Sequence, residues 1–181
     1  MKPIAGRVMA SMLALTVTML ASASGELQIT ENGVGPIGAA TRFNQKAIQQ
    51  LLPGYTVTMG KRSTEGESYR VILVARQGKT LATINPAEGE KGIFSIRVRD
   101  KTVVNRLGPA IGASYTSIFG TTGNAGCSAG QEELSGKVIC PHPKSRRVAY
   151  LLSGKYNGPD GRVPPMTSLK NFVVEEIVWR P

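Results

Sequence analysis

The sequence predicts an α+β fold: a mainly antiparallel sheet with one clear helix and one short helix. Apolar residues recur at helical spacing in one stretch, residues 41–52. Most of the remaining chain consists of short alternating segments, separated by turn residues at hairpin distances. With 181 residues, of which 41% are hydrophobic and 19% charged, the chain is long enough for one sizeable core and too apolar to be disordered.

The first 23 residues have the pattern of an export signal. Lys2 and Arg7 form a basic head, residues 8–20 form an apolar run without a charge, and Ala21-Ser22-Ala23 supplies the small residues that a signal peptidase recognises. The run is shorter than the roughly 20 apolar residues of a membrane span; an uncleaved anchor is the alternative. We therefore expect a signal peptide, residues 1–23, and a single periplasmic domain, residues 24–181. No cysteine lies near the cut, so a lipidation cysteine is lacking.

The first half of this domain predicts a strand, a helix and a meander. A short strand begins at Leu27 and ends at turn residues 33–36. Thr41 can cap the helix, an apolar stripe from Phe43 to Leu52 forms its buried side, and Pro53-Gly54 ends it. Four strands at hairpin spacing follow, at residues 55–59, 69–75, 80–84 and 93–98.

The second half repeats this plan faintly. Residues 108–114 echo residues 35–41, and a short helical stretch from Tyr115 to Phe119 follows and ends at Gly120. Two further strands are predicted, at residues 148–152 and 172–179. The domain is therefore expected to consist of two similar half-units, 24–100 and 101–181; chance similarity between two glycine-rich turns is the alternative.

Cys127 and Cys140 are the only two cysteines, and both lie in the exported part. Export places them in an oxidising compartment, where an even count predicts a disulfide. The bridge would stabilise a segment rich in Gly, Ser and Asn by about 3 kcal/mol in the chain-entropy model. Two buried free thiols are the alternative.

Residues 33–38 have the spacing of a dinucleotide-binding loop, but Pro36 removes a backbone donor and no acidic residue lies about 20 positions further on. We interpret this segment as a turn between strand and helix. His142, the only histidine, lies between two prolines and lacks partners for a catalytic relay or a metal site, so we interpret it as a surface loop residue. No cofactor and no metal are expected.

Paired carboxylates offer little more support for catalysis. Glu175 and Glu176 are consecutive in a strand and should point to opposite faces. The pairs Glu132-Glu133 and Glu65 with Glu67 lie in predicted loops and turns. We interpret all three pairs as solvated surface, and no catalytic residue is assigned.

A surplus of positive charge is the remaining feature: 22 Lys and Arg against 12 Asp and Glu give a net charge of +10. In the strand 93–99, Phe94, Ile96 and Val98 should face the core while Ser95, Arg97 and Arg99 face solvent. Further cations lie in nearby elements: Lys61, Arg62, Arg70, Arg76, Lys101, Arg106, Lys144, Arg146 and Arg147. A basic face of this kind could meet anionic lipid, lipopolysaccharide or peptidoglycan. General solubility is the alternative, and nucleic acid is not expected in this compartment.

The C-terminal part carries a family resemblance. Tyr150, Ser153-Gly154, the turn at residues 158–161, Leu169-Lys170-Asn171 and the closing Ile177-Val178-Trp179-Arg180, with Gly33-Val34-Gly35 and Ala47-Ile48, resemble the RpoE-regulated lipoprotein family of Gram-negative envelopes. This is the domain-of-unknown-function family numbered 1131. The resemblance implies a protein associated with envelope stress, with no established enzymatic activity and no catalytic residues to carry over.

These observations predict a non-enzymatic binding or interaction module of the cell envelope, with Arg97 and Arg99 on its surface for an anionic partner. Its partner would be an anionic envelope component or another protein. A hydrolase or modifying enzyme acting on cell wall or lipid is the alternative, and a secreted inhibitor of a foreign enzyme is a third possibility. A pocket with converging carboxylates would favour the enzyme, whereas a basic sheet face, flat or grooved, would favour the module.

Overall fold

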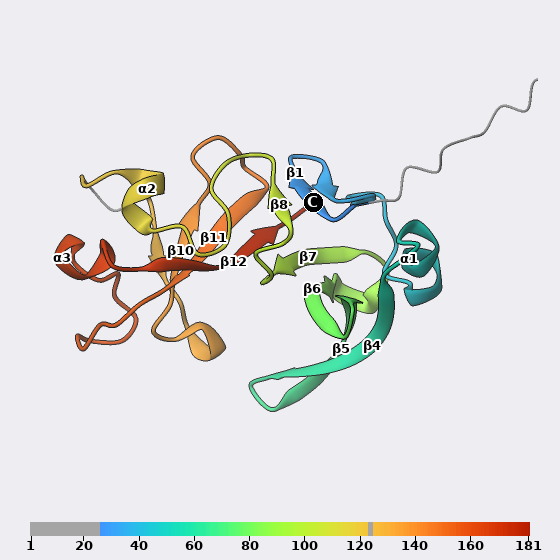
Figure 1. Ribbon diagram of the computed structural model, residues 1–181. Helices are drawn as coiled ribbons and strands as arrows, with labels where there is room; N and C mark the ends of the chain where they lie inside the picture. The colour runs from blue at the N-terminus through green and yellow to red at the C-terminus, as the bar shows by residue number, and fades with distance from the viewer. Residues whose placement is uncertain (1–25, 123–124) are drawn as a thin grey trace, which may run out of the picture.

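The computed structural model describes residues 26–122 and 125–181, and it has the α+β fold that the sequence predicts. Its largest element is an eight-stranded antiparallel sheet (Figure 1). The strands of this sheet follow one another in the order β4 (Thr56–Thr64), β5 (Glu67–Arg76), β6 (Lys79–Pro86), β7 (Ile93–Val98), β12 (Val173–Trp179), β11 (Val148–Ser153), β10 (Val138–Pro141) and β9 (Ser128–Ala129).

A smaller sheet and three helices complete the fold. The small sheet has the order β3 (Ile37–Gly38), β2 (Gly33–Val34), β1 (Gln28–Thr30) and β8 (Val104–Asn105), and β1 pairs with β8 in parallel. The helices are α1 (Gln45–Leu51), α2 (Tyr115–Phe119) and α3 (Met166–Leu169), with 3₁₀ turns at Glu88–Glu90 and Glu132–Leu134. The export signal predicted at residues 1–23 lies outside the described residues. Within the described part, no helix is long and apolar enough to cross a membrane.

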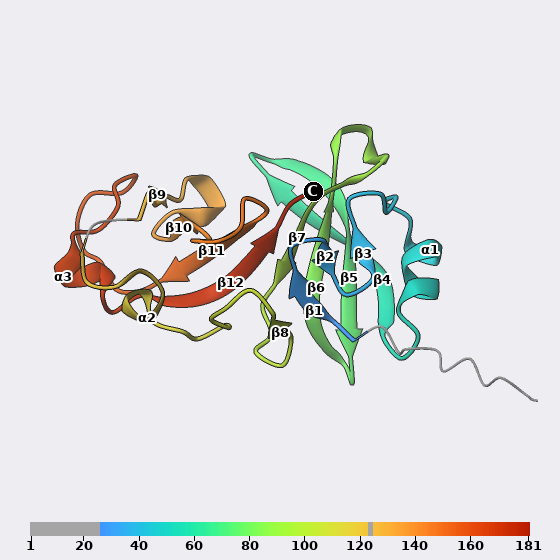
Figure 2. The same cartoon turned by 90° about the horizontal axis from the view of Figure 1, so that it is seen from above.

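Each half of the chain builds half of the large sheet. The first half runs from α1 through the meander β4 to β7, and the second runs from α2 through β9 to β12 (Figure 2). The last strand of each half lies at the centre, where β7 and β12 pair antiparallel through Val98 and Ile177. Both halves therefore place strands in the same order outward from the centre. Duplication of one ancestral unit stays a prediction.

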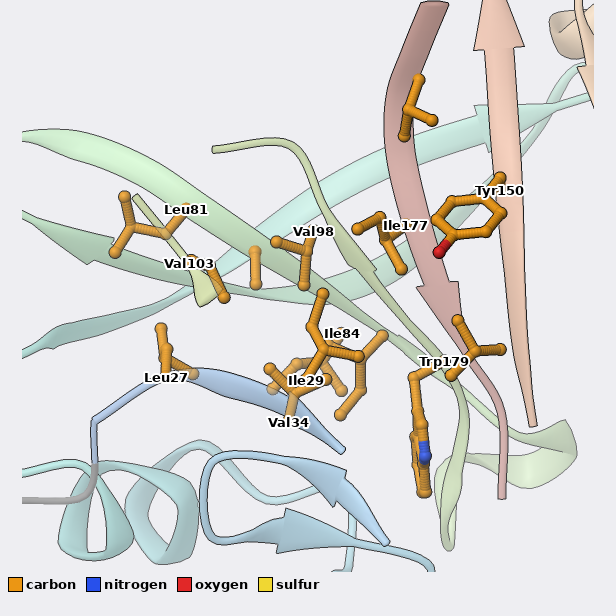
Figure 3. Packing of buried hydrophobic residues seen from close by; sticks show 14 of the residues in the cluster. Leu27, Ile29, Val34, Leu81, Ile84, Val98, Val103, Tyr150, Ile177 and Trp179 are labelled. Atoms are coloured by element: carbon orange, nitrogen blue, oxygen red, sulfur yellow. The ribbon is translucent and has the colours of Figure 1, made fainter. Parts of the chain in front are cut away.

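The main core lies between the large sheet and the small one (Figure 3). Ile29 and Val34 of the small sheet face Ile84, Val98 and Ile177 of the large one, and all of them are fully buried. Trp179, also fully buried, donates from its indole Nε1 to the Glu31 carbonyl at 3.1 Å. Burial of this apolar surface is the main source of stability, and the indole bond ties β12 to the turn after β1.

Several local predictions need correction. The first helix begins at Gln45, because Asn44 rather than Thr41 caps it: the Asn44 side chain accepts from the Ala47 amide at 2.9 Å. Residues 33–38 form the hairpin β2–β3 rather than a turn into a helix. A Cβ on Gly33 would lie 2.0 Å from the Ile37 carbonyl oxygen, so the tight hairpin requires glycine.

The structure contains the predicted disulfide between Cys127 and Cys140. Cys140 lies on β10 and is fully buried in the main core, and Cys127 lies just before β9. The bridge therefore fastens β10 to the loop that leads into the edge strand β9.

Candidate functional site

The face of the large sheet that points away from the main core carries the candidate site. On β12, Val174, Ile177 and Trp179 belong to the core, while Glu176 and Val178 point to the opposite face, which we call the open face. This face is apolar in part. Val71 and Leu151 are 1% exposed, yet neither belongs to the main core cluster.

β-Bulges in the two central strands set which side chains reach the open face. On β7, Asn85 pairs with Ser95 and Pro86 pairs with Ile93, so Phe94 is an extra residue without a partner. Phe94 was predicted to face the core with Ile96 and Val98; that prediction is wrong, because the bulge turns its ring outward and leaves it 54% exposed.

The bulge on β12 works in the same way. Leu151 pairs with Glu176 and Leu152 pairs with Val174, which leaves Glu175 as the extra residue. In a strand without a bulge, Val174 and Glu176 would point to the same face, because they are two residues apart. The bulge thus keeps Val174 in the core and turns Glu176 to the open face.

A hollow of about 450 Å³, which we call the groove, lies on the open face. Its floor consists of Ile139, Ala149, Leu151 and Val178 from the three adjacent strands β10, β11 and β12. Tyr69 of β5 and Leu134 of the 3₁₀ turn lie at its sides, and Phe94 and Pro86 add apolar surface. The volume falls within the roughly 300–1,000 Å³ of sites for small ligands.

The two ends of the large sheet approach each other across this face. In both views the tip of the β4–β5 hairpin lies beside the segment between β9 and β10 (Figures 1 and 2). The Thr64 hydroxyl donates to the Glu133 carboxylate and lowers its pKa, whereas the neighbouring Glu65 carboxyl raises the pKa of Glu132. These contacts join elements of the two halves and bound the open face on one side.

Arg97 and Arg99 both lie on the open face, but their environments differ from the prediction. Arg97 makes a two-pronged bond to Glu176, with Nε–Oε2 at 2.6 Å and Nη2–Oε1 at 3.1 Å. Arg99 pairs with the Oε1 atom of the same carboxylate. The Glu176 side chain is 0% exposed and that of Arg97 only 17%, against 45% for Arg99. The interpretation of Glu176 as solvated surface was therefore wrong.

A second group of cations lies at the other end of the groove. Arg146 and Arg147 come from the turn between β10 and β11, and Arg180 follows β12. Within the described residues none of the three has an ion pair; the Arg180 guanidinium lies over the Phe94 ring, 5.1 Å from its centroid. Positive charge at this end of the groove is therefore not paired with any carboxylate in the part of the chain that the structure describes.

His142 and Ser145 hold the turn that carries Arg146 and Arg147. The His142 Nδ1 atom accepts from the Lys144 amide at 3.0 Å, and the Ser145 hydroxyl oxygen accepts from the amides of Arg147 and Val148, each at 3.1 Å. His142 is 5% exposed and Ser145 8%. His142 is thus a buried residue that fixes the turn, and its interpretation as a surface residue was wrong.

Arg62 extends the cationic surface toward β4. It lines a neighbouring hollow of about 270 Å³ together with Arg97 and Arg99, and Arg97 lines the groove as well. Burial lowers the pKa of Arg62, and the positive charges of Arg99 and Arg97 lower it further. The cationic surface therefore continues from the groove into the neighbouring hollow.

The sequence of this chain and its fold identify a family. Residues 16–181 match the family described as "Protein of unknown function (DUF1131)". The chain belongs to this family. The uncharacterized protein YfeY of Escherichia coli strain K12 is 30% identical over 156 residues, which cover 84% of this chain and 79% of that protein. A crystal structure of YfeY from Escherichia coli is similar, with a TM-score of 0.69 and 27% identity, and covers 85% of this chain and 99% of that one.

Among the cations named from the sequence of this DUF1131 protein, the structure brings Arg62, Arg97, Arg99, Arg146 and Arg147 to one face. Others have different partners: Arg70 pairs with Glu90, Arg76 lies over the Tyr55 ring and Arg106 bonds to Gln28. Sequence reasoning missed Arg180 and Glu176. The available signal was their spacing: Glu176, Val178 and Arg180 are two residues apart along the last strand, so all three lie on the same side of it.

Proposed function

We propose that this protein is an exported, periplasmic binding module of the cell envelope, and that it holds an anionic partner in the groove. The observation that carries the proposal is the cluster of Arg146, Arg147 and Arg180 beside an apolar floor, a cluster without an ion pair among the described residues. Export rests on the charge-free run at residues 8–20 and on Ala21-Ser22-Ala23. Within the envelope, the anionic candidates are lipid, lipopolysaccharide and peptidoglycan.

The chemistry of the groove supports binding rather than catalysis. Its lining contains no Asp, Glu, His or Cys, so it offers no carboxylate, imidazole or thiol as a general base and no carboxylate pair. The serine that lines the groove next to the arginines is Ser95. The Ser95 Oγ atom accepts a hydrogen bond from the Asn85 side-chain amide at 3.0 Å, and the groove lining places no base beside it. A grooved basic sheet face is the arrangement that favours a recognition module.

The resemblance to RpoE-regulated lipoproteins supports the further proposal that envelope stress regulates this protein. We do not propose a lipid anchor, because Cys127 is the first cysteine of the sequence and lies far from the predicted cut. We expect a protein released into the periplasm with Ser24 as its first residue. Intact mass of the periplasmic form tests this; full-length protein that only detergent extracts would contradict it.

Co-sedimentation tests the anionic partner. The purified protein is mixed with vesicles containing anionic lipid, with lipopolysaccharide and with peptidoglycan, each at low and at high salt. We expect binding to at least one of them at low salt and weaker binding at high salt, because the Debye length shortens to about 3 Å at 1 M. No binding to any of the three at low salt would overturn the proposal.

The informative variant removes the cations that have no structural partner. Arg146→Gln/Arg147→Gln/Arg180→Gln should weaken binding, whereas substituting Arg97 would also disturb buried Glu176. A matched control is Lys46→Gln/Lys155→Gln/Lys170→Gln, which removes the same charge from exposed residues outside the groove. Equal weakening by the two triple variants would mean that net charge, not the groove, drives binding.

A further inference from the structure

The floor of the groove offers apolar contact and no hydrogen bonds. Ile139, Ala149, Leu151 and Val178 are aliphatic, and they stand on strands whose backbone groups pair with one another in the sheet. A peptide lying here would leave its own amides and carbonyls without partners, which is unfavourable for buried polar groups. The same applies to a sugar chain with its many hydroxyls. An alkyl chain has no such requirement.

Charge is distributed unequally along the groove. Strand register gives the order: Arg180 lies at one end, Val178 lies opposite Ala149 in the middle, and Leu151 pairs with Glu176 at the other end. Arg97 stands opposite Val178 in the middle, and Arg99 lines the neighbouring hollow; the guanidinium groups of both are occupied by Glu176. Arg146, Arg147 and Arg180 at the first end have no carboxylate among the described residues. The end of the groove at Arg180 therefore suits an anion, and the floor suits apolar contact.

The cationic end is also held in place before any ligand arrives. His142 and Ser145 fix the turn that carries Arg146 and Arg147, and the Arg180 amide donates to the Arg147 carbonyl at 2.8 Å. The backbones of Arg147 and Arg180 are thus joined directly. A pre-organised cluster of guanidinium groups loses little order on binding an anion and can bind its oxygens in pairs.

We propose that the groove binds a single-chain amphiphile with an anionic head group. The alkyl chain lies over Val178, Ala149, Leu151 and Ile139, and the head group lies between Arg146, Arg147 and Arg180. A volume of about 450 Å³ suits one chain with its head group. This inference rests on the proposed function, because it names the ligand class of the same groove.

Calorimetric titration with alkyl phosphates tests the inference. Inorganic phosphate and butyl, hexyl, octyl and decyl phosphate are compared below the concentrations at which they form micelles. Affinity should rise about fourfold per methylene group while the chain still fits, which corresponds to about 0.8 kcal/mol per buried CH₂. Octyl glucoside, which has the same chain and no charge, should bind at least tenfold more weakly than octyl phosphate.

Two variants separate the two ends of the site. Ala149→Trp places a large ring on the floor and should abolish the dependence on chain length, while Ala40→Trp, at an exposed position outside the groove, should not. Arg146→Gln/Arg147→Gln/Arg180→Gln should reduce octyl phosphate affinity at least tenfold and leave octyl glucoside unchanged. Thermal melting checks that each variant folds. The chain-length series on the unmodified protein tests the inference even if a variant does not fold.

The outcomes distinguish this inference from the proposed function. If affinity for the phosphates is the same at every chain length, or if no alkyl phosphate binds, the inference is overturned even where sedimentation with anionic vesicles succeeds. If affinity rises with chain length but no vesicle, lipopolysaccharide or peptidoglycan sediments the protein, the groove binds free amphiphiles and the proposed surface binding fails. Binding of vesicles alone, without binding of monomeric alkyl phosphates, counts against the inference.

Discussion

Consecutive residues of β12 belong to two different environments. Ile177 and Trp179 are fully buried in the core beneath the small sheet, whereas Val178 between them lines the groove on the open face. The core face contains aliphatic and aromatic side chains from both sheets. The open face combines a small apolar floor with six arginines that line its two hollows, Arg62, Arg97, Arg99, Arg146, Arg147 and Arg180.

This contrast shows what each face does for the molecule. Apolar burial on the core face stabilises the fold without any demand for partners. Buried Glu176 on the open face is tolerated only because two guanidinium groups neutralise it, and such an arrangement stabilises a fold less than apolar residues of the same volume would. Stability alone therefore does not account for the charges of the open face.

The sharpest way to separate the two faces is to truncate neighbours on one strand. Trp179→Ala should lower the free energy of unfolding by about 3–5 kcal/mol, because it leaves a cavity in the core and removes the indole bond to Glu31. Val178→Ala should lower it by only about 1 kcal/mol, since its side chain is half-buried and faces the groove. Urea denaturation of both variants measures the difference. Equal losses would mean that the open face contributes as much to stability as the core.

The second test breaks the ionic cluster. Arg97→Met removes the two-pronged partner of a fully buried carboxylate and should lower stability by about 3 kcal/mol or more. Adding Glu176→Leu to that variant should recover most of the loss, because the buried carboxylate is gone and Arg99, which loses its partner, is 45% exposed to water. Arg99→Met is the matched control, and its cost should be smaller because Arg99 is 45% exposed.

Denaturant unfolding of the two single variants, the double variant and the control completes this cycle. A single Arg97→Met variant as stable as the unmodified protein would show that Glu176 does not depend on Arg97. The sequence alone placed Arg97 and Arg99 on the solvent side of their strand, where a substitution has little effect on folding. The structure replaces that expectation for Arg97, whose side chain is mostly covered.

Regular elements with strong periodic patterns were predictable from the sequence. Ile93–Val98 has the predicted bounds, Tyr115–Phe119 forms the predicted short helix before Gly120, and the last strand differs at one end only. These segments are rich in β-branched and aromatic residues or have helical spacing, and turn residues lie at their ends. The strand Val138–Pro141 was missed, because four residues that include a cysteine and a proline give no clear period.

The candidate site was predictable in composition but not in geometry. The cations of the strand 93–99 were placed on the correct face, yet the bulges at Phe94 and Glu175 shift the pattern by one residue and cannot be read from alternation. Burial of Glu176 and His142 depends on partners more than 30 residues away: Arg97 bonds to Glu176, and the Leu107 backbone bonds to His142. Long-range contacts of this kind leave no local signal in the sequence.

The smallest expected effect concerns His142, which holds the arginine turn of the open face. Burial lowers the pKa of this imidazole below its usual 6.5, because the charged form loses its hydration; the Lys144 charge adds to the effect, while the Leu107 backbone and Glu31 oppose it. Protonation of Nδ1 would also break its bond from the Lys144 amide. The unfolded chain binds a proton near pH 6.5 and the folded chain resists it. Stability from this group is therefore complete above pH 6.5 and is lost as the pH falls through the folded pKa.

His142→Asn is the variant that isolates this effect. An Asn side chain can accept from the amide two residues further on, as His142 does, and it does not titrate. Melting temperatures are measured between pH 7.5 and pH 5, above the range in which Asp100, with a pKa lowered to about 2 by Lys79 and Thr102, binds a proton. The unmodified protein should lose stability over this range relative to His142→Asn, and its affinity for octyl phosphate should fall in parallel, because the turn that carries Arg146 and Arg147 loses its acceptor. Identical pH profiles for the two proteins would show that His142 packs against the turn without controlling it.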